Sequence, residues 1–157
     1  MVMIMRNWAL GGLPNEEKGM IDKARVHEHV DDWVRRIEAM YALVEHVVAN
    51  VPGVACEKSS NMTMHEELMH KHGVPPRQVP ILDIRKNGKI AVSFKPVGLW
   101  VVGANGRIDI LMAKGGYYLV DKADFGQPPQ WEAFPLQNKR AGILFDAAFI
   151  IDLVRRA

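Results

Sequence analysis

The spacing of the apolar residues changes at Val79, and this change constrains the fold more than any other feature of the sequence. Upstream, apolar residues recur every three or four positions, as on one side of a helix. Downstream, they alternate with polar residues, as in a strand with one buried face. The turn signals Asn87-Gly88, Asn105-Gly106 and Gly115-Gly116 divide this part into short segments. The sequence therefore predicts an antiparallel meander of about five strands over residues 79–134, with later strands at 99–104, 107–112, 117–120 and 131–134.

The turn of the first hairpin decides which side chains face the core. A two-residue Asn87-Gly88 turn would place Arg85 opposite Ile90 and mix charged and apolar side chains on one face. A three-residue turn that includes Lys86, with Gly88 left-handed beside a bulge, pairs apolar residues with one another. Its pairs are Ile84 with Ile90, Leu82 with Val92, and Pro80 with Phe94. We predict this second register, which would bury Ile84, Ile90, Val92 and Phe94 together.

Two helices are predicted before the sheet, in a helical part that spans residues 15–73. The first is long and amphipathic over residues 30–48, and Asn50-Val51-Pro52-Gly53 stops it. Asn15, followed by two glutamates, could cap an earlier start. The second is short, because the capping box Thr63-Met64-His65-Glu66 starts it and Gly73 ends it.

A third helix is predicted at the C-terminal end, within residues 139–156. The apolar run 143–154 fits a strand or a helix, but its length, Ala147-Ala148 and the final Arg155-Arg156 favour a helix. Because this helix is apolar on nearly all sides, we expect it to be covered by the sheet and by either the long helix or a second subunit. The last alternative predicts a homodimer.

Composition indicates one α+β domain over residues 1–157, with the sheet covered by these three helices. The chain is 48% hydrophobic and 24% charged, which is ordinary for a globular protein. Cys56 has no partner for an intramolecular disulfide, which favours a reducing compartment. The apolar start is broken at Arg6 before it resembles a signal peptide, and no segment is long enough to span a membrane. We expect a cytoplasmic protein.

Charge is distributed unevenly along the chain. Residues 1–76 hold 8 Lys/Arg against 11 Asp/Glu, a net −3, and residues 77–122 hold 8 against 3, a net +5. The remaining residues hold 4 of each. The basic middle segment can form a surface for anions, or it can face the acidic segment within the fold.

Basic and aromatic residues alternate within this basic segment and form the candidate binding site. The candidate residues are Lys95, Trp100, Arg107, Lys114, Tyr117 and Tyr118. An open antiparallel sheet can stack bases on such rings and place phosphates on such cations, which predicts a single-stranded nucleic acid or another anion as ligand. In the alternative, Trp100 and one tyrosine pack under a helix and the basic groups only keep the strand ends in water.

The histidines and the cysteine do not form a recognisable metal or catalytic motif. His65 and His70 are five residues apart, whereas a helical zinc pair needs a spacing of four. His27 and His29 alternate on a helix, and no histidine motif accompanies Cys56. The glycines do not have the spacing of a phosphate-binding loop. Neither a metal nor a cofactor is predicted.

Three classes of function remain open. We predict a non-catalytic binding or interaction module that acts through the sheet surface or a dimer. The alternative is a small hydrolase-like enzyme whose acid/base residues meet only in the fold, such as Asp109 or Asp121 with Lys114, Tyr117 or a histidine of the short helix. A small-molecule pocket between sheet and helices needs no motif and is the third class.

Overall fold

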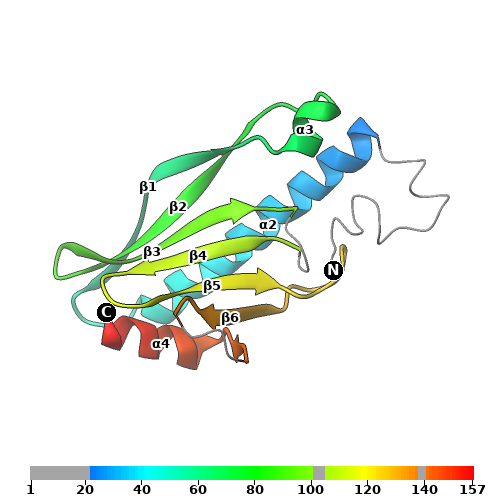
Figure 1. Cartoon of the computed structure of the whole chain (residues 1–157). Helices are drawn as coiled ribbons and strands as arrows, with labels where there is room; N and C mark the ends of the chain where they lie inside the picture. Colours follow the sequence, from blue (N-terminus) through cyan, green and yellow to red (C-terminus); the bar gives the residue numbers. More distant parts are fainter. Residues whose placement is uncertain (1–21, 101–104, 138–140) are drawn as a thin grey trace.

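A computed structural model describes residues 22–100, 105–137 and 141–157. These residues form one seven-stranded antiparallel sheet in which each strand pairs with the next along the chain (Figure 1). The strands are β1 (Val54–Met64), β2 (Arg77–Lys86), β3 (Lys89–Gly98), β4 (Arg107–Met112), β5 (Gly116–Asp121), β6 (Trp131–Pro135) and β7 (Ile143–Leu144). The helices are α2 (Lys23–Val48), α3 (Glu67–Lys71) and α4 (Ala147–Arg156). The predicted class, an α+β fold with an antiparallel meander, is confirmed, but the sheet has seven strands rather than five.

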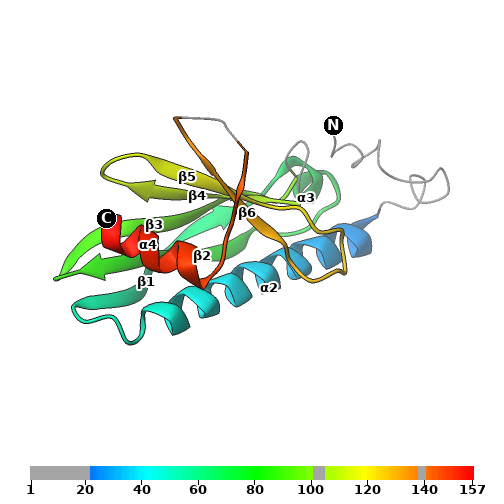
Figure 2. The same ribbon diagram turned by 90° about the horizontal axis from the view of Figure 1, so that it is seen from below.

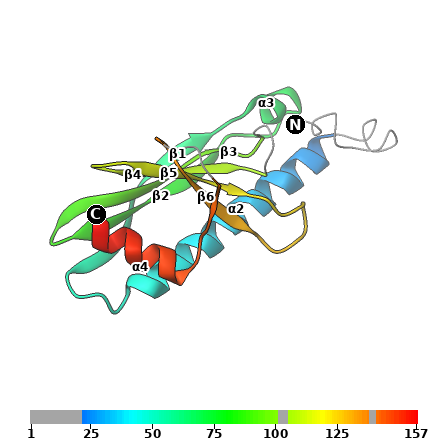
Figure 3. The ribbon, with the colours of Figure 1, turned by 60° about the horizontal axis from the view of Figure 1, so that its bottom comes forward.

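The helices are arranged on one side of the sheet. Figures 2 and 3 show α2 and α4 next to each other on the same face, while α3 lies at the end of the sheet near the start of α2. No helix of the described residues covers the opposite face, which we call the open face. None of the described helices combines the length and the apolar composition that crossing a membrane requires.

The predicted apolar stripe of the long helix is confirmed in α2. The helix begins at Lys23, where the Asp22 carboxylate accepts a hydrogen bond from the backbone N–H of Arg25 at 3.0 Å. The alternative cap at Asn15 lies outside the described residues. The stripe packs on the covered face of the sheet, and its buried apolar members are Val26, Val30, Trp33, Ile37, Met40, Tyr41, Val44 and Val48.

The β2–β3 hairpin corrects the predicted register. Asn87 and Gly88 have φ angles of 54° and 83°, and the turn between the paired lysines has two residues rather than three. Arg85 lies opposite Ile90, and Ala91 is then an extra residue in β3, a β-bulge that shifts the register. Beyond it, Ile84 pairs with Val92, and Leu82 with Phe94. These four residues are 0% exposed whereas Ile90 is 52% exposed, so the bulge confines the mismatch of charged and apolar residues to the hairpin tip.

The capping box at Thr63 is wrong, because this residue lies in β1, a strand that the sequence pattern did not predict. The Thr63 hydroxyl accepts a hydrogen bond from the Gln78 side chain of β2 at 2.8 Å instead of capping a helix. Glu66 precedes α3, and its carboxylate accepts hydrogen bonds from the backbone N–H groups of Leu99 at 2.7 Å and Trp100 at 3.1 Å. The polar side chains of β1 gave no period-two signal because most of this edge strand is in contact with water.

The predicted strand at 99–104 is also corrected. β3 continues to Gly98, Leu99 and Trp100 form a bend, and residues 101–104 lie outside the described residues. The partner of β4 is therefore β3, with Phe94 opposite Ile110. The predicted strands at 107–112, 117–120 and 131–134 are confirmed as β4, β5 and β6.

The apolar run near the C-terminal end is divided into a strand and a helix. Ile143 and Leu144 form β7, and α4 begins only after Asp146, whose carboxylate accepts a hydrogen bond from the Phe149 N–H at 2.9 Å. α4 buries one face, made by Phe149, Ile150, Leu153 and Val154. It therefore does not need cover on several sides. Homodimerisation stays a prediction, without the reason that the sequence suggested for it.

Candidate anion-binding groove

The six candidate binding residues do not form one site. Lys95 and Tyr118 lie on the open face in one cross-strand row, together with Asp109 and Phe134, and Arg107 is a neighbour of this row. Three of the six, Lys95, Arg107 and Tyr118, are thus brought together, and the other three are separated from them.

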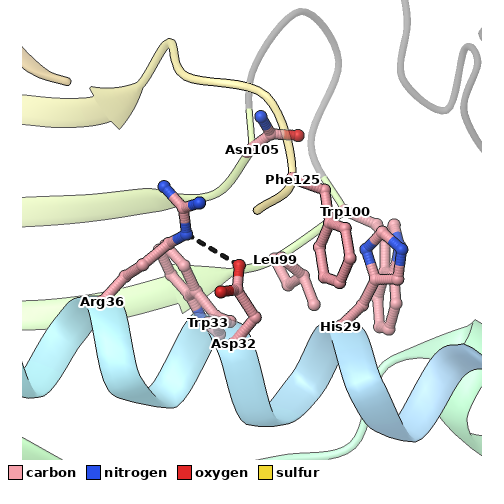
Figure 4. Close-up of a pocket in the computed structure, with 8 residues that line it drawn as sticks. All are labelled: His29, Asp32, Trp33, Arg36, Leu99, Trp100, Asn105 and Phe125. Carbon is pink, nitrogen blue, oxygen red and sulfur yellow. Dashed lines mark hydrogen bonds and ion pairs between the residues drawn. The ribbon is translucent and has the colours of Figure 1, made fainter. Parts of the chain in front are cut away.

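The three separated residues lie in different environments. Tyr117 is on the covered face, where its ring packs on Phe149 at 5.1 Å and its hydroxyl accepts a hydrogen bond from Arg156 at 2.7 Å. Trp100 is half-buried in the bend after β3, beside α2 (Figure 4). Lys114 is exposed in the turn between β4 and β5. The packing predicted in the alternative reading therefore describes Tyr117.

Most charges on the open face are compensated by a neighbour. Arg107 forms an ion pair with Asp109 at 2.8 Å, and Lys122 forms one with Glu132 at 3.0 Å. Among the described residues, Lys95 has no ion pair within 4.0 Å. The open face therefore has few free cations to offer to phosphates.

The aromatic rings of the open face are already stacked. The rings of Tyr118 and Phe134 are nearly parallel, with centroids 5.2 Å apart. Arg107 lies 4.7 Å from the Tyr118 centroid, and Lys122 lies 5.3 Å from the Phe134 centroid. A base would have to displace these contacts to stack, so nucleic-acid binding on this face stays a prediction that the geometry does not favour.

A groove with a volume of about 480 Å³ lies at the end of the sheet that holds the tip of the β2–β3 hairpin. We call it the hairpin groove. It is bounded by the tip of the β2–β3 hairpin, the β4–β5 turn and the C-terminal end of α4. Figure 1 shows the hairpin extending past this turn, with the end of α4 beside it. Its charged lining residues are Lys86, Lys89, Lys114 and Arg156. The lining that the structure describes contains no aspartate or glutamate side chain.

Two of these four cations are held by the protein. The Lys86 ammonium donates hydrogen bonds to the carbonyl oxygens of Val154 at 2.9 Å and Ala157 at 2.8 Å, at the negative end of the α4 dipole. Arg156 pairs with Asp152 at 2.8 Å and donates to the Tyr117 hydroxyl. These contacts fix the positions of both cations at the rim of the groove.

The other two cations, Lys89 and Lys114, have no partner in the part of the chain that the structure describes. Both side chains are exposed, and neither forms an ion pair or a hydrogen bond with any described residue. Two uncompensated ammonium groups thus line the groove together with two fixed cations. An anion that enters the groove meets the two uncompensated ammonium groups, together with Lys86 and with Arg156, whose charge Asp152 already pairs.

The lining of the hairpin groove has an apolar part, and the groove is bordered by a short free strand edge. Ile90, Ala91 and Met112 line it, and Ile90 is 52% exposed. The pairing of β3 with β4 starts at Val92 and Met112, so residues 89–91 have no partner on the β4 side. The groove therefore offers apolar contact and backbone polar groups as well as positive charge.

A second polar cluster, near the middle of α2, has a structural role (Figure 4). The buried Arg36 guanidinium binds Asp32 at 2.7 Å and Asp121 at 2.6 Å, and it donates to two carbonyl groups of the loop between β5 and β6. Asp121 also accepts from the backbone N–H groups of Ala123 and Gln130, each at 2.9 Å. This network anchors the loop to α2.

The cavity beside this cluster is too small for a ligand. It offers about 10 Å³, which is room for one water molecule. Its lining includes His29, which stacks on Phe125 at 4.0 Å between ring centroids. Burial and the charge of Arg25 lower the pKa of His29 to about 4, so the imidazole is neutral at neutral pH.

The two aspartates proposed for a hydrolase are each engaged by an arginine. Asp121 is 0% exposed and engaged by Arg36, whereas Asp109 lies on the open face with Arg107. The rings of His65 and His70 are in contact at 5.4 Å, but no three His, Cys, Asp or Glu residues of the described chain are arranged to hold a metal ion. Burial, together with Glu45, raises the pKa of the Cys56 thiol to about 11, so it is protonated and unreactive at neutral pH.

Sequence reasoning found one residue of the hairpin groove, Lys114, and missed Lys86, Lys89 and Arg156. A local signal existed for two of them, because Lys86 and Lys89 flank the Asn87-Gly88 turn and so share one hairpin tip. Their proximity to Arg156 depends on how α4 packs, which no local pattern encodes.

Comparisons with known proteins give no further assignment: no family model, no curated protein and no solved structure matches this chain.

Proposed function

We propose that this protein is a non-catalytic binding protein that takes an anionic ligand in the hairpin groove. One observation carries the proposal: Lys86, Lys89, Lys114 and Arg156 surround a groove of about 480 Å³ whose described lining has no acidic side chain. Ligand sites in proteins commonly have volumes of roughly 300 to 1,000 Å³. The groove therefore has the size of a site for a small molecule or a short segment of a larger one.

The chemistry of the lining supports an anion as the ligand. Lys89 and Lys114 carry charges that nothing in the described protein neutralises, and an anion between them would relieve their mutual repulsion. Arg156 adds a planar guanidinium, which suits carboxylate and phosphate groups. The free energy gained on binding comes from these charges, and it should decrease as salt screens them.

The same lining supports binding rather than acid/base catalysis. Its described part contains lysine, arginine, asparagine and apolar residues, without a histidine, cysteine, serine, aspartate or glutamate. General acid/base and nucleophilic catalysis usually depend on groups of those types. The lysines are the side chains of this described lining that could act as acid, base or nucleophile, and the lining provides no carboxylate or imidazole beside them to take part in such a step.

The test is a titration with inorganic pyrophosphate, followed by calorimetry and by amide chemical shifts. We expect Lys89→Gln combined with Lys114→Gln to weaken binding by about tenfold or more, because each lost charge contributes on the order of 1 kcal/mol near water. The matched control is Lys23→Gln with Lys71→Gln, which removes two exposed lysines at the opposite end of the molecule, neither of which is paired with a described residue. Equal weakening in both double variants, or no binding at millimolar pyrophosphate, would contradict the proposal.

A further inference from the structure

The hairpin groove contains a strand edge as well as a cluster of cations. β2 and β3 extend beyond β4, because the β3–β4 pairing ends at Val92 and Met112 (Figure 1). On the β4 side, residues 89–91 have no neighbouring strand, and no backbone hydrogen bond joins them to the β4–β5 turn. This edge is short and contains the bulge at Ala91, so it can pair with only a few residues of an extended segment. A ligand in the groove can thus form backbone hydrogen bonds as well as ion pairs.

We infer that the ligand of the hairpin groove is an extended acidic peptide segment that pairs with β3 at residues 89–91. The inference rests on the proposed anion-binding function and identifies its ligand class. Strand addition provides the affinity of backbone hydrogen bonds, and side-chain pockets provide the choice of sequence. Here Lys89 and Lys114 select carboxylates, and the exposed Ile90 beside Met112 accepts an apolar side chain.

Charge complementarity favours this occupant over a second copy of the chain. A second copy that paired edge to edge through the same groove would bring its own Lys86, Lys89, Lys114 and Arg156 next to these cations. Like charges that are brought close together oppose association. An acidic segment instead compensates the two unpaired lysines, while β3 gains the neighbouring strand that it lacks.

A free inorganic anion uses only part of this site. It can bind the ammonium groups, but it makes no apolar contact with Ile90 or Met112 and does not extend along a strand edge. The peptide uses the charges, the apolar lining residues and the strand edge together. The experiment therefore separates the contribution of charge from that of backbone pairing.

The probe is a capped pentapeptide of alternating glutamate and valine, titrated into the whole chain alongside inorganic pyrophosphate. Its control is the same peptide with N-methylated backbone amides, which keeps the carboxylates and removes the donors that a strand needs. We expect the unmodified peptide to bind at least about tenfold more tightly than the methylated one, a difference of about 1.4 kcal/mol. We also expect it to slow hydrogen exchange at residues 89–91.

The outcomes distinguish the two proposals. If pyrophosphate binds but both peptides fail to bind, or bind with equal affinity, the groove is an anion site and the inference about a peptide is wrong. If neither pyrophosphate nor peptide binds, the proposed function itself fails. If the Lys89→Gln and Lys114→Gln double variant self-associates while the wild-type chain binds no peptide, the lysines only protect a strand edge, and the inference is again overturned.

Discussion

Removal of the negative charge at Asp121 tests whether the buried ion pair holds the β5–β6 loop on α2. Asp121 is 0% exposed and its carboxylate is 2.6 Å from the Arg36 guanidinium, whose own side chain is 6% exposed. In Asp121→Asn, the amide can still accept hydrogen bonds from Ala123 and Gln130, but Arg36 loses one of its two carboxylates. Breaking a buried pair by removing one partner costs about 3 to 5 kcal/mol. Because Asp32 remains, we expect the lower end, about 3 kcal/mol of unfolding free energy.

Urea denaturation followed by tryptophan fluorescence measures this loss of unfolding free energy. Trp33 and Trp131 report on it because they lie close to the Arg36–Asp121 pair, and the centroids of the two tryptophan rings are 5.8 Å from each other. In a protein of this size, about 3 kcal/mol corresponds to a decrease in Tm of roughly 6 to 12 °C. The control is Asp109→Asn, which breaks the solvent-accessible pair with Arg107 and should cost about 1 kcal/mol or less. The reasoning is refuted if Asp121→Asn costs no more than this control, or if it weakens pyrophosphate binding in the distant hairpin groove.

Three further predictions concern stability. Because burial and Arg25 lower the pKa of His29 from 6.5 to about 4, the unfolded chain binds a proton between these values that the folded chain does not. The unfolding free energy should therefore decrease by about 3 kcal/mol as pH falls from 6.5 to 4, and chemical denaturation across this range should show a flatter profile for His29→Gln. Gly106→Ala should lower the unfolding free energy by roughly 3 kcal/mol in the same assay, because φ of this residue is +110° and the new Cβ would lie 2.2 Å from Cζ3 of Trp33. An unchanged denaturation midpoint would contradict this packing. Tyr41→Phe should lower the unfolding free energy by about 1 to 2 kcal/mol, because it removes a buried hydroxyl that lies within hydrogen-bonding distance of the carbonyl oxygens of Pro80 (2.7 Å) and Phe94 (3.1 Å). A loss below about 0.5 kcal/mol would show that water replaces the hydroxyl.

Elements whose signals lie between near neighbours could be predicted from the sequence. The apolar stripe of α2, the strands β4, β5 and β6, and the end of α3 before Gly73 each depend on residues a few positions apart. The prediction failed where two local patterns competed. Thr63 fits a capping box as well as a strand, and only its pairing with Gln78 of β2 decides for the strand.

The register of the first hairpin shows the same limit. The turn residues favoured one register and the apolar residues another, and the bulge at Ala91 satisfies both, because it lets the core pairs form beyond a two-residue turn. No count of alternating residues distinguishes a bulge from a longer turn. The bulge is preferred because it places Ile84 and Phe94 under the helices.

Local patterns in the chain were enough to predict a helical part followed by a meander, and counting residues was enough to find an excess of positive charge in the middle of the chain. Where that charge gathers depends on the tertiary packing. In the structure, Arg107 is paired with Asp109 on the open face and Tyr117 is buried under α4. Lys89 and Lys114 line the same groove as Arg156. The physical reason is that helix and strand signals act over a few residues, whereas the hairpin groove depends on how far each strand extends and where α4 ends against them.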